Sequence, residues 1–113
     1  MAIAEQGSVG GTCVTRGCIP EKLMSFAAEL SEDSQVAAGY GWNKPQHTFD
    51  CQQFIATKER EIHHLSKVHN QKLEKIRVER IKGCATFVDA HTLDVGGGKI
   101  RADKILITVG QKT

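Results

Sequence analysis

The 113 residues are enough for one small domain with a modest hydrophobic core. Charged side chains make up 25% of the chain, which does not favour disorder, and the net charge of +2 is too small to indicate binding to nucleic acid or to a membrane surface. No apolar run approaches the roughly 20 residues of a membrane-spanning helix. The chain turns acidic at Glu5, too early for a signal peptide, so we expect a cytoplasmic protein in a reducing environment.

The N-terminal stretch predicts a short strand followed by a loop. Ala2-Ile3-Ala4 is an apolar run that ends at Glu5. Residues 6–11 are rich in glycine, which is typical of a flexible turn.

A close pair of cysteines follows this loop. Cys13 and Cys18 have four residues between them, and Pro20 comes just after the second. Proline suits the first turn of a helix, so the pair is expected to straddle a loop-to-helix junction. A thiol near a helix N-terminus is favoured as the thiolate, the species that attacks disulfides. In a reducing environment such a pair is more often catalytic or metal-binding than structural.

Helical periodicity predicts two helices. The first runs from Ile19 to about residue 30, and the polar residues 31–38 either end or extend it. Residues 38–42, together with Pro45, predict a turn-rich connection. Asp50 is expected to cap a second, amphipathic helix, with Gln53 three residues later, and the apolar spacing continues to about Arg77.

After the second helix the apolar period changes to two, which predicts strands. Four short strands are expected at 78–83, 85–88, 92–95 and 99–102, with turns at 89–91 and 96–98. Residues 104–109 form a nearly continuous apolar run that predicts a buried parallel strand. The expected fold is therefore α/β, with two helices, a small β-meander and a remnant of a parallel sheet.

Metal binding is a weaker interpretation of the same residues. A structural zinc site normally shows two close Cys or His pairs, whereas this chain has only one. Two of the candidate histidines are adjacent and cannot share one helix face. We therefore expect no metal site. We expect Cys51 and Cys84 to be ordinary buried or half-buried thiols. The cysteines and histidines considered are Cys13, Cys18, Cys51, Cys84, His63, His64 and His69.

Residues 10–24 carry a specific motif: two glycines, Thr-Cys, four residues, then Cys-apolar-Pro and a lysine. The motif resembles the redox-active disulfide segment of the flavin-dependent pyridine nucleotide–disulfide oxidoreductases, and among them most closely the glutathione reductases. The resemblance implies that residues 1–113 are a partial, Rossmann-like FAD-binding domain. The G-x-G-x-x-G loop, the NADPH domain and the dimerisation domain of that family have no counterpart in these residues, so we expect the chain alone to be inactive.

The resemblance also implies a reaction. In such an enzyme NADPH reduces FAD, the flavin reduces the Cys13–Cys18 disulfide, and the dithiol reduces a disulfide substrate such as oxidised glutathione. Cys13 is expected to lie nearer the flavin and Cys18 to attack the substrate. Two thiols are needed because the mixed disulfide must be resolved internally, which is a proximity effect. The full-length enzymes of the family are homodimers.

Further residues match cofactor-binding positions of the family. Glu5 would accept hydrogen bonds from the adenosine ribose of FAD. Gly11 would allow close approach of the backbone to the flavin's phosphate and ribityl region, and Thr12 would supply a hydroxyl and an N–H. Ala85, in the Gly-Cys-Ala segment at 83–85, would lie next to the adenine and offer it backbone groups. Gly110 closes a segment similar to the family's Ile-Leu-Ile-Ala-Thr-Gly signature.

One position departs from the family pattern. The family has two basic residues after the proline, and the first lies against the flavin ring. In this chain Glu21 stands there and Lys22 keeps the second position. A carboxylate at Glu21 would repel an anionic reduced flavin instead of stabilising it.

Two other interpretations remain open. The chain could be a non-enzymatic α/β remnant that retains a redox-sensitive cysteine pair and binds a partner through an unpaired sheet edge. It could also be a standalone flavin-binding module. A flavin spectrum distinguishes the flavin-binding interpretations from the remnant.

Overall fold

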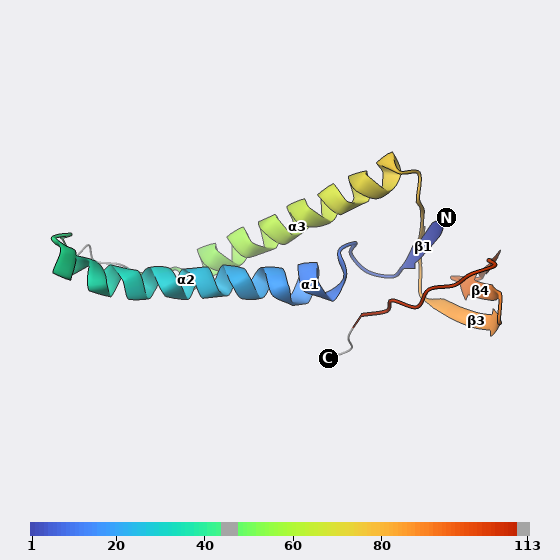
Figure 1. Cartoon of the computed structure of the whole chain (residues 1–113), viewed down its shortest axis with the longest axis horizontal. Helices are drawn as coiled ribbons and strands as arrows, with labels where there is room; N and C mark the ends of the chain where they lie inside the picture. The colour runs from blue at the N-terminus through green and yellow to red at the C-terminus, as the bar shows by residue number, and fades with distance from the viewer. Residues whose placement is uncertain (44–47, 111–113) are drawn as a thin grey trace.

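Two parallel strands far apart in the sequence organise the fold (Figure 1). The computed structural model describes residues 1–43 and 48–110. Strand β1 (Ala2–Glu5) pairs in parallel with β2 (Glu79–Lys82), with Glu5 opposite Lys82 at the carboxyl ends. The N–H of Gly83 extends the pairing by donating to the carbonyl oxygen of Glu5 at 3.2 Å. The predicted strand at the N-terminus is confirmed.

The connection between these strands is helical, as a parallel pair requires a long crossover. It comprises α1 (Gly11–Arg16), α2 (Cys18–Val36), the 3-10 helix η1 (Ala37–Tyr40) and α3 (Cys51–Lys75). Helices α2 and α3 lie side by side and extend away from the strands (Figure 1). The polar segment after residue 30 extends α2 to Val36 and does not end it. Pro45, expected in the turn after this segment, lies outside the described residues.

The prediction that the cysteines straddle a loop-to-helix junction is wrong in one respect. Cys13 already lies in a helix, α1, so the described ranges hold three α-helices and not two. Gly17 separates α1 from α2 with φ −125° and ψ −115°, outside the helical region. A Cβ at Gly17 would lie 3.1 Å from the carbonyl oxygen of Thr12, so glycine allows the two helices to meet closely.

The expected cap of the long helix is confirmed. Asp50 accepts a hydrogen bond from the backbone N–H of Gln53 at 2.9 Å, which satisfies one of the unpaired donors of the first turn. The helix ends at Lys75, two residues before the predicted end. Arg77 has a positive φ of 57°, and the N–H of Val78 donates to the carbonyl oxygen of Leu73 at 2.9 Å, which closes the last turn.

The predicted β-meander is confirmed, although β2 is not part of it. Strands β3 (Ala85–Asp89), β4 (Thr92–Val95) and β5 (Gly98–Arg101) form an antiparallel sheet in sequential order. Asp89 stabilises the first turn by accepting the backbone N–H of His91 at 2.8 Å. This hydrogen bond to the carboxylate lowers the pKa of Asp89.

The buried parallel strand predicted at 104–109 is wrong. Residues 104–110 form neither strand nor helix, and Leu106 and Val109 are 85% and 90% exposed. An apolar run becomes a buried parallel strand only when neighbouring strands bind its backbone groups. Within the described ranges β1 pairs only with β2, and no strand pairs with residues 104–110.

The described residues bury little apolar surface. Val9, Ile62, Val78 and Val95 are the buried hydrophobic side chains. The accessible surface is 9554 Å², whereas a compact protein of 12.4 kDa exposes about 6,100 Å². The radius of gyration is 20.8 Å, compared with about 13 Å for a compact domain of similar length. In the described part of the chain, no helix is both long and apolar enough to span a membrane.

The cap of α3 gives a direct test of this local structure. Replacing Asp50 with alanine removes the acceptor for the Gln53 N–H and is expected to destabilise the first turn by ~1 kcal/mol. Hydrogen exchange of the amides of residues 52–54 measures the effect. Asp50→Asn retains a capping side chain and serves as the control. Equal protection in the wild type and in Asp50→Ala would contradict the assignment of this cap.

Candidate functional site

The site is built around the disulfide between Cys13 and Cys18. The bond joins α1 to the first residue of α2, and the two Cα atoms are 4.7 Å apart, within the ordinary range for disulfides. Both cysteines are exposed. The buried Pro20 lies in the first turn of α2, where a proline needs no N–H partner. The predicted pairing of these two residues is confirmed.

Cys18 lies at the N-terminus of α2. It is the first residue of a 19-residue helix, so the unpaired N–H groups and the positive end of the helix dipole lie beside it. The residue is exposed to solvent. A helix N-terminus lowers the pKa of a nearby thiol in general, and the thiolate is the attacking species in disulfide exchange.

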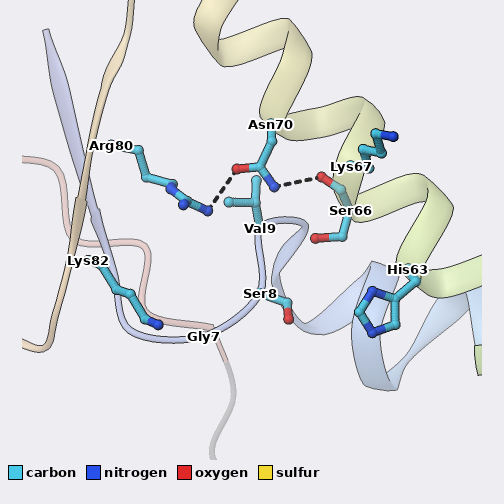
Figure 2. Close-up of a pocket in the computed structure, with 9 residues that line it drawn as sticks. All are labelled: Gly7, Ser8, Val9, His63, Ser66, Lys67, Asn70, Arg80 and Lys82. Carbon is cyan, nitrogen blue, oxygen red and sulfur yellow. Dashed lines mark hydrogen bonds between the residues drawn. The ribbon is translucent and has the colours of Figure 1, made fainter.

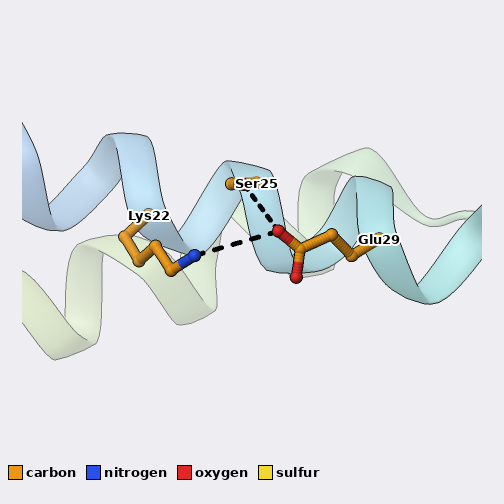
Figure 3. A network of polar contacts seen from close by, with 3 residues as sticks. All are labelled: Lys22, Ser25 and Glu29. Atoms are coloured by element: carbon orange, nitrogen blue, oxygen red, sulfur yellow. Dashed lines mark hydrogen bonds and ion pairs between the residues drawn. The ribbon is translucent and has the colours of Figure 1, made fainter.

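An open hollow of about 370 Å³ lies next to Cys18 and is lined also by Glu21, Lys22 and Ser25. Lys22 is directed along α2 toward the later residues of the helix (Figure 3). Its Nζ lies 3.8 Å from Oε1 of Glu29 and 4.3 Å from the centre of the Phe26 ring. Ser25 donates its hydroxyl to the same Glu29 oxygen at 3.0 Å. These exposed contacts are weak, so Lys22 can leave them at small cost in free energy.

Glu5 lies at the carboxyl end of β1, next to the segment that follows β2. Its carboxylate oxygen Oε1 accepts the backbone N–H of Gly7 at 2.7 Å. Its carbonyl oxygen accepts the N–H of Gly83 at 3.2 Å. The pairing therefore brings Glu5 close to the Gly83-Cys84-Ala85 step, which leads into β3 at Ala85.

Residues 104–110 return to the start of α1 (Figure 1). Gly110 has a positive φ of 73°, and a Cβ there would lie 2.7 Å from the hydroxyl oxygen of Thr12. Gly11 also has a positive φ, 65°, but has open space around it. The structure thus brings together Gly11, Thr12, Cys13 and Gly110, four of the residues predicted to bind a cofactor.

The other two cysteines differ from the prediction. Cys51 and Cys84 are exposed free thiols, not buried or half-buried ones. Cys51 is the first residue of α3, and Cys84 lies in the short link between two separate sheets. In the ranges 1–43 and 48–110, no group of three His, Cys, Asp or Glu side chains is placed to hold a metal ion.

Sequence reasoning missed a second hollow, between the loop after β1, helix α3 and strand β2. Its basic side chains Arg80 and Lys82 come from β2, and its polar side chains Ser66 and Asn70 come from α3. The basic residues at alternate positions of β2, Arg80 and Lys82, are the sequence feature that could have indicated this hollow. It could be interpreted only once the strand was known to lie against α3.

Comparison with known proteins identifies relatives of this chain. No protein-family model matches the chain. A glutathione reductase from Nostoc sp. is 48% identical over 110 residues, which cover 97% of this chain and 24% of that protein. The chloroplastic/mitochondrial glutathione reductase of Pisum sativum is 40% identical over 92% of this chain and 19% of that protein. This chain is homologous to glutathione reductases.

The resemblance to the pyridine nucleotide–disulfide oxidoreductases is thereby confirmed. The homology is not restricted to glutathione reductases, since a mercuric reductase from Lysinibacillus sphaericus is 34% identical over 97% of the chain. The chain spans about a quarter or less of the length of these relatives.

The contact between Gly110 and Thr12 can be tested by substitution. Gly110→Ala places a Cβ against the Thr12 hydroxyl and also disfavours the left-handed backbone, by about 1–2 kcal/mol. We expect the C-terminal segment to detach and the NMR amide signal of Thr12 to shift. Gly41→Ala is the matched control, because Gly41 has a φ of 85° and no neighbour within 4 Å. An unshifted Thr12 signal in Gly110→Ala would show that the contact does not form.

Proposed function

We propose that this chain is part of the Rossmann-like FAD-binding domain of a disulfide reductase, with Cys13 and Cys18 as its redox-active pair. The observation that carries the proposal is the Cys13–Cys18 disulfide at the N-terminus of α2, one loop after a parallel strand that ends in Glu5. In α/β folds, ligands bind at the carboxyl ends of parallel strands. Along the chain, the redox pair therefore comes directly after the sheet edge where a dinucleotide would bind.

The residues at this edge fit the adenosine part of FAD. Glu5 is half-buried, and one carboxylate oxygen is held by the Gly7 N–H, while the second makes no hydrogen bond within the described ranges. That oxygen can accept a ribose hydroxyl. The adjoining step at 83–85, with Ala85, offers backbone groups beside it.

The residues around the disulfide fit the flavin part of the cofactor. Gly11 has open space around its Cα, so a ligand can approach the backbone there. Thr12, Cys13 and Gly110 lie close by and offer a hydroxyl, a sulfur and a main chain without a side chain. When bound, FAD would supply two-electron transfer from NADPH to the disulfide.

The proposed exchange uses the two thiols in sequence. The Cys18 thiolate attacks one sulfur of the substrate disulfide, forms a mixed disulfide and releases the first thiolate. The Cys13 thiolate then attacks the Cys18 sulfur, re-forms the Cys13–Cys18 disulfide and releases the second thiolate, and water supplies the two protons. The substrate is reduced by two electrons and the protein is oxidised by two. The Cα separation of 4.7 Å keeps the resolving sulfur within reach throughout.

Glu21 modifies this site. It lines the hollow next to Cys18, at the position where the resembled family has a basic residue. Lys22 lines the same hollow, but its amine lies 3.8 Å from Oε1 of Glu29. The negative charge of Glu21 disfavours a reduced, anionic flavin. It also disfavours a thiolate in the same hollow. We therefore propose that this chain binds flavin more weakly than a chain with a basic residue at this position. We also propose that its bound flavin is reduced less readily.

The substrate is proposed on homology. Three relatives named glutathione reductase match nearly the whole chain, which supports oxidised glutathione as the substrate. The names of the relatives include mercuric reductase and thioredoxin reductase, so the shared segment serves more than one substrate class. NADPH as the electron donor and a homodimeric enzyme are proposed from the resemblance to the family. A cytoplasmic location is a separate proposal, which the names of the relatives do not support, because two of them are named as chloroplastic or mitochondrial enzymes.

A second candidate function is a non-enzymatic α/β remnant. The small set of buried side chains and the large exposed apolar surface favour it. The outer edge of β1 has no partner strand in the described residues, which leaves its backbone groups available to another chain. Such a remnant would keep the Cys13–Cys18 pair and would bind no flavin.

Flavin retention tests the proposal. The chain is purified with FAD, and its absorbance spectrum is recorded before and after desalting. We expect retained flavin absorbance and, on partial reduction, a long-wavelength charge-transfer band that is lost in Cys13→Ser but kept in Cys51→Ser. Glu21→Lys is expected to tighten flavin binding about tenfold, since one charge at short range contributes ~1 kcal/mol or more.

The control and the contrary result are specific. Glu32→Lys makes the same charge change at an exposed position farther along α2 and is expected to leave flavin binding unchanged. A colourless protein after desalting, in both the wild type and Glu21→Lys, would reject FAD binding by this chain and favour the remnant.

A further inference from the structure

A second hollow, of about 320 Å³, lies on the α3 side of the parallel strands (Figure 2). The loop after β1, helix α3 and strand β2 enclose it on three sides. None of its lining residues belongs to the cysteine pair. The lining residues are Gly7, Ser8, Val9, His63, Ser66, Lys67, Asn70, Arg80 and Lys82.

The charged side chains that line this hollow are all basic. Arg80, Lys82 and Lys67 line it together with His63, and no acidic residue is among the lining residues. The ion pairs in the described ranges are Lys22–Glu29 and Lys58–Glu59, so none of these cations forms an ion pair there. Glu5, which accepts the N–H of the lining residue Gly7, is the carboxylate next to the hollow. In Figure 2 the amine of Lys67 points away from the hollow, whereas Arg80 and Lys82 reach toward it.

The guanidinium of Arg80 is held in place by helix α3. Its Nη1 donates to Oδ1 of Asn70 at 2.8 Å, and Nδ2 of Asn70 donates in turn to the carbonyl oxygen of Ser66 at 2.9 Å (Figure 2). One side-chain amide therefore couples β2 to the helix backbone. This arrangement fixes one donor of the guanidinium and leaves its other N–H groups for a ligand.

Hydroxyl groups complete the surroundings. Ser8 in the loop and Ser66 on α3 line the hollow, and the side chain of Val9 is buried beside them. The site thus combines two converging cations with neutral donors around one concave surface. This combination matches an anion with several acceptor oxygens better than a single carboxylate.

We propose that this hollow binds the phosphate of a small phosphomonoester. A phosphate dianion balances Arg80 and Lys82, and a guanidinium fork matches its oxygens. The volume of about 320 Å³ is within the range of small-ligand sites and leaves room for the organic part of the ligand. The proposal does not depend on flavin binding, because the chain alone forms the hollow.

Titration with inorganic phosphate at constant ionic strength tests the site. Two-dimensional NMR follows the Arg80 Nε–H, the Asn70 side-chain amide and the Ser8 backbone amide. We expect saturable shifts of these signals, with affinity reduced about five- to tenfold in Arg80→Gln and partly restored in Arg80→Lys. Lys99→Gln removes an exposed cation on β5, outside the hollow, and is expected to bind phosphate like the wild type.

Other results would overturn the proposal. Shifts that do not saturate, or an equal loss in Arg80→Gln and Lys99→Gln, would mean that phosphate only screens surface charge. Adenosine 5′-monophosphate should shift the same signals as inorganic phosphate, and FAD should not displace phosphate. Displacement by FAD would assign the hollow to a dinucleotide pyrophosphate and reject the monoester. A chain that binds no FAD but still binds phosphate would reject only the flavin proposal.

Discussion

The parallel pairing of β1 with β2 is the constraint on which the rest of the structure depends. It joins residues 2–5 to residues 79–82, and a parallel pair forces the intervening chain to cross over as helices. The same pairing places Glu5 beside Gly83 and directs the following loop toward α1. Both candidate sites, the redox disulfide and the basic hollow, lie at elements whose positions this pairing determines.

Outside this pairing the molecule holds together mainly through local structure. In helix α2, Met24 and Phe26 are each 49% exposed and Leu30 is 70% exposed. Burial of apolar surface contributes about 25 cal/mol per Å², so these side chains contribute only part of the stability that a buried face would give. The Cys13–Cys18 bond fixes α1 against α2 by covalent linkage where apolar packing is small.

The sequence was sufficient for the features that depend on local patterns. Helical periodicity and the Asp50 cap located α3, and alternation located the meander of β3, β4 and β5. The motif around Cys13 and Cys18 indicated both the disulfide and the family.

Features that depend on distant partners could not be predicted. The apolar run at 104–109 has the composition of a buried strand, but a strand also needs a paired edge, which composition does not report. The basic hollow required the contact between Arg80 on β2 and Asn70 on α3, which follows from the tertiary arrangement of the two elements. The exposure of Cys51 and Cys84 likewise depends on how little of the chain packs around them.

In the proposed function, Cys13 and Cys18 form a reversible redox pair distinct from the other thiols. The most direct measurement equilibrates the chain with a series of oxidised and reduced glutathione mixtures, alkylates the thiols, and maps the disulfides by mass spectrometry. We expect reversible conversion between the Cys13–Cys18 disulfide and dithiol, with Cys51 and Cys84 forming no disulfide with either. Pairing of Cys13 or Cys18 with Cys51 or Cys84, or stable glutathione adducts in place of the internal disulfide, would contradict it.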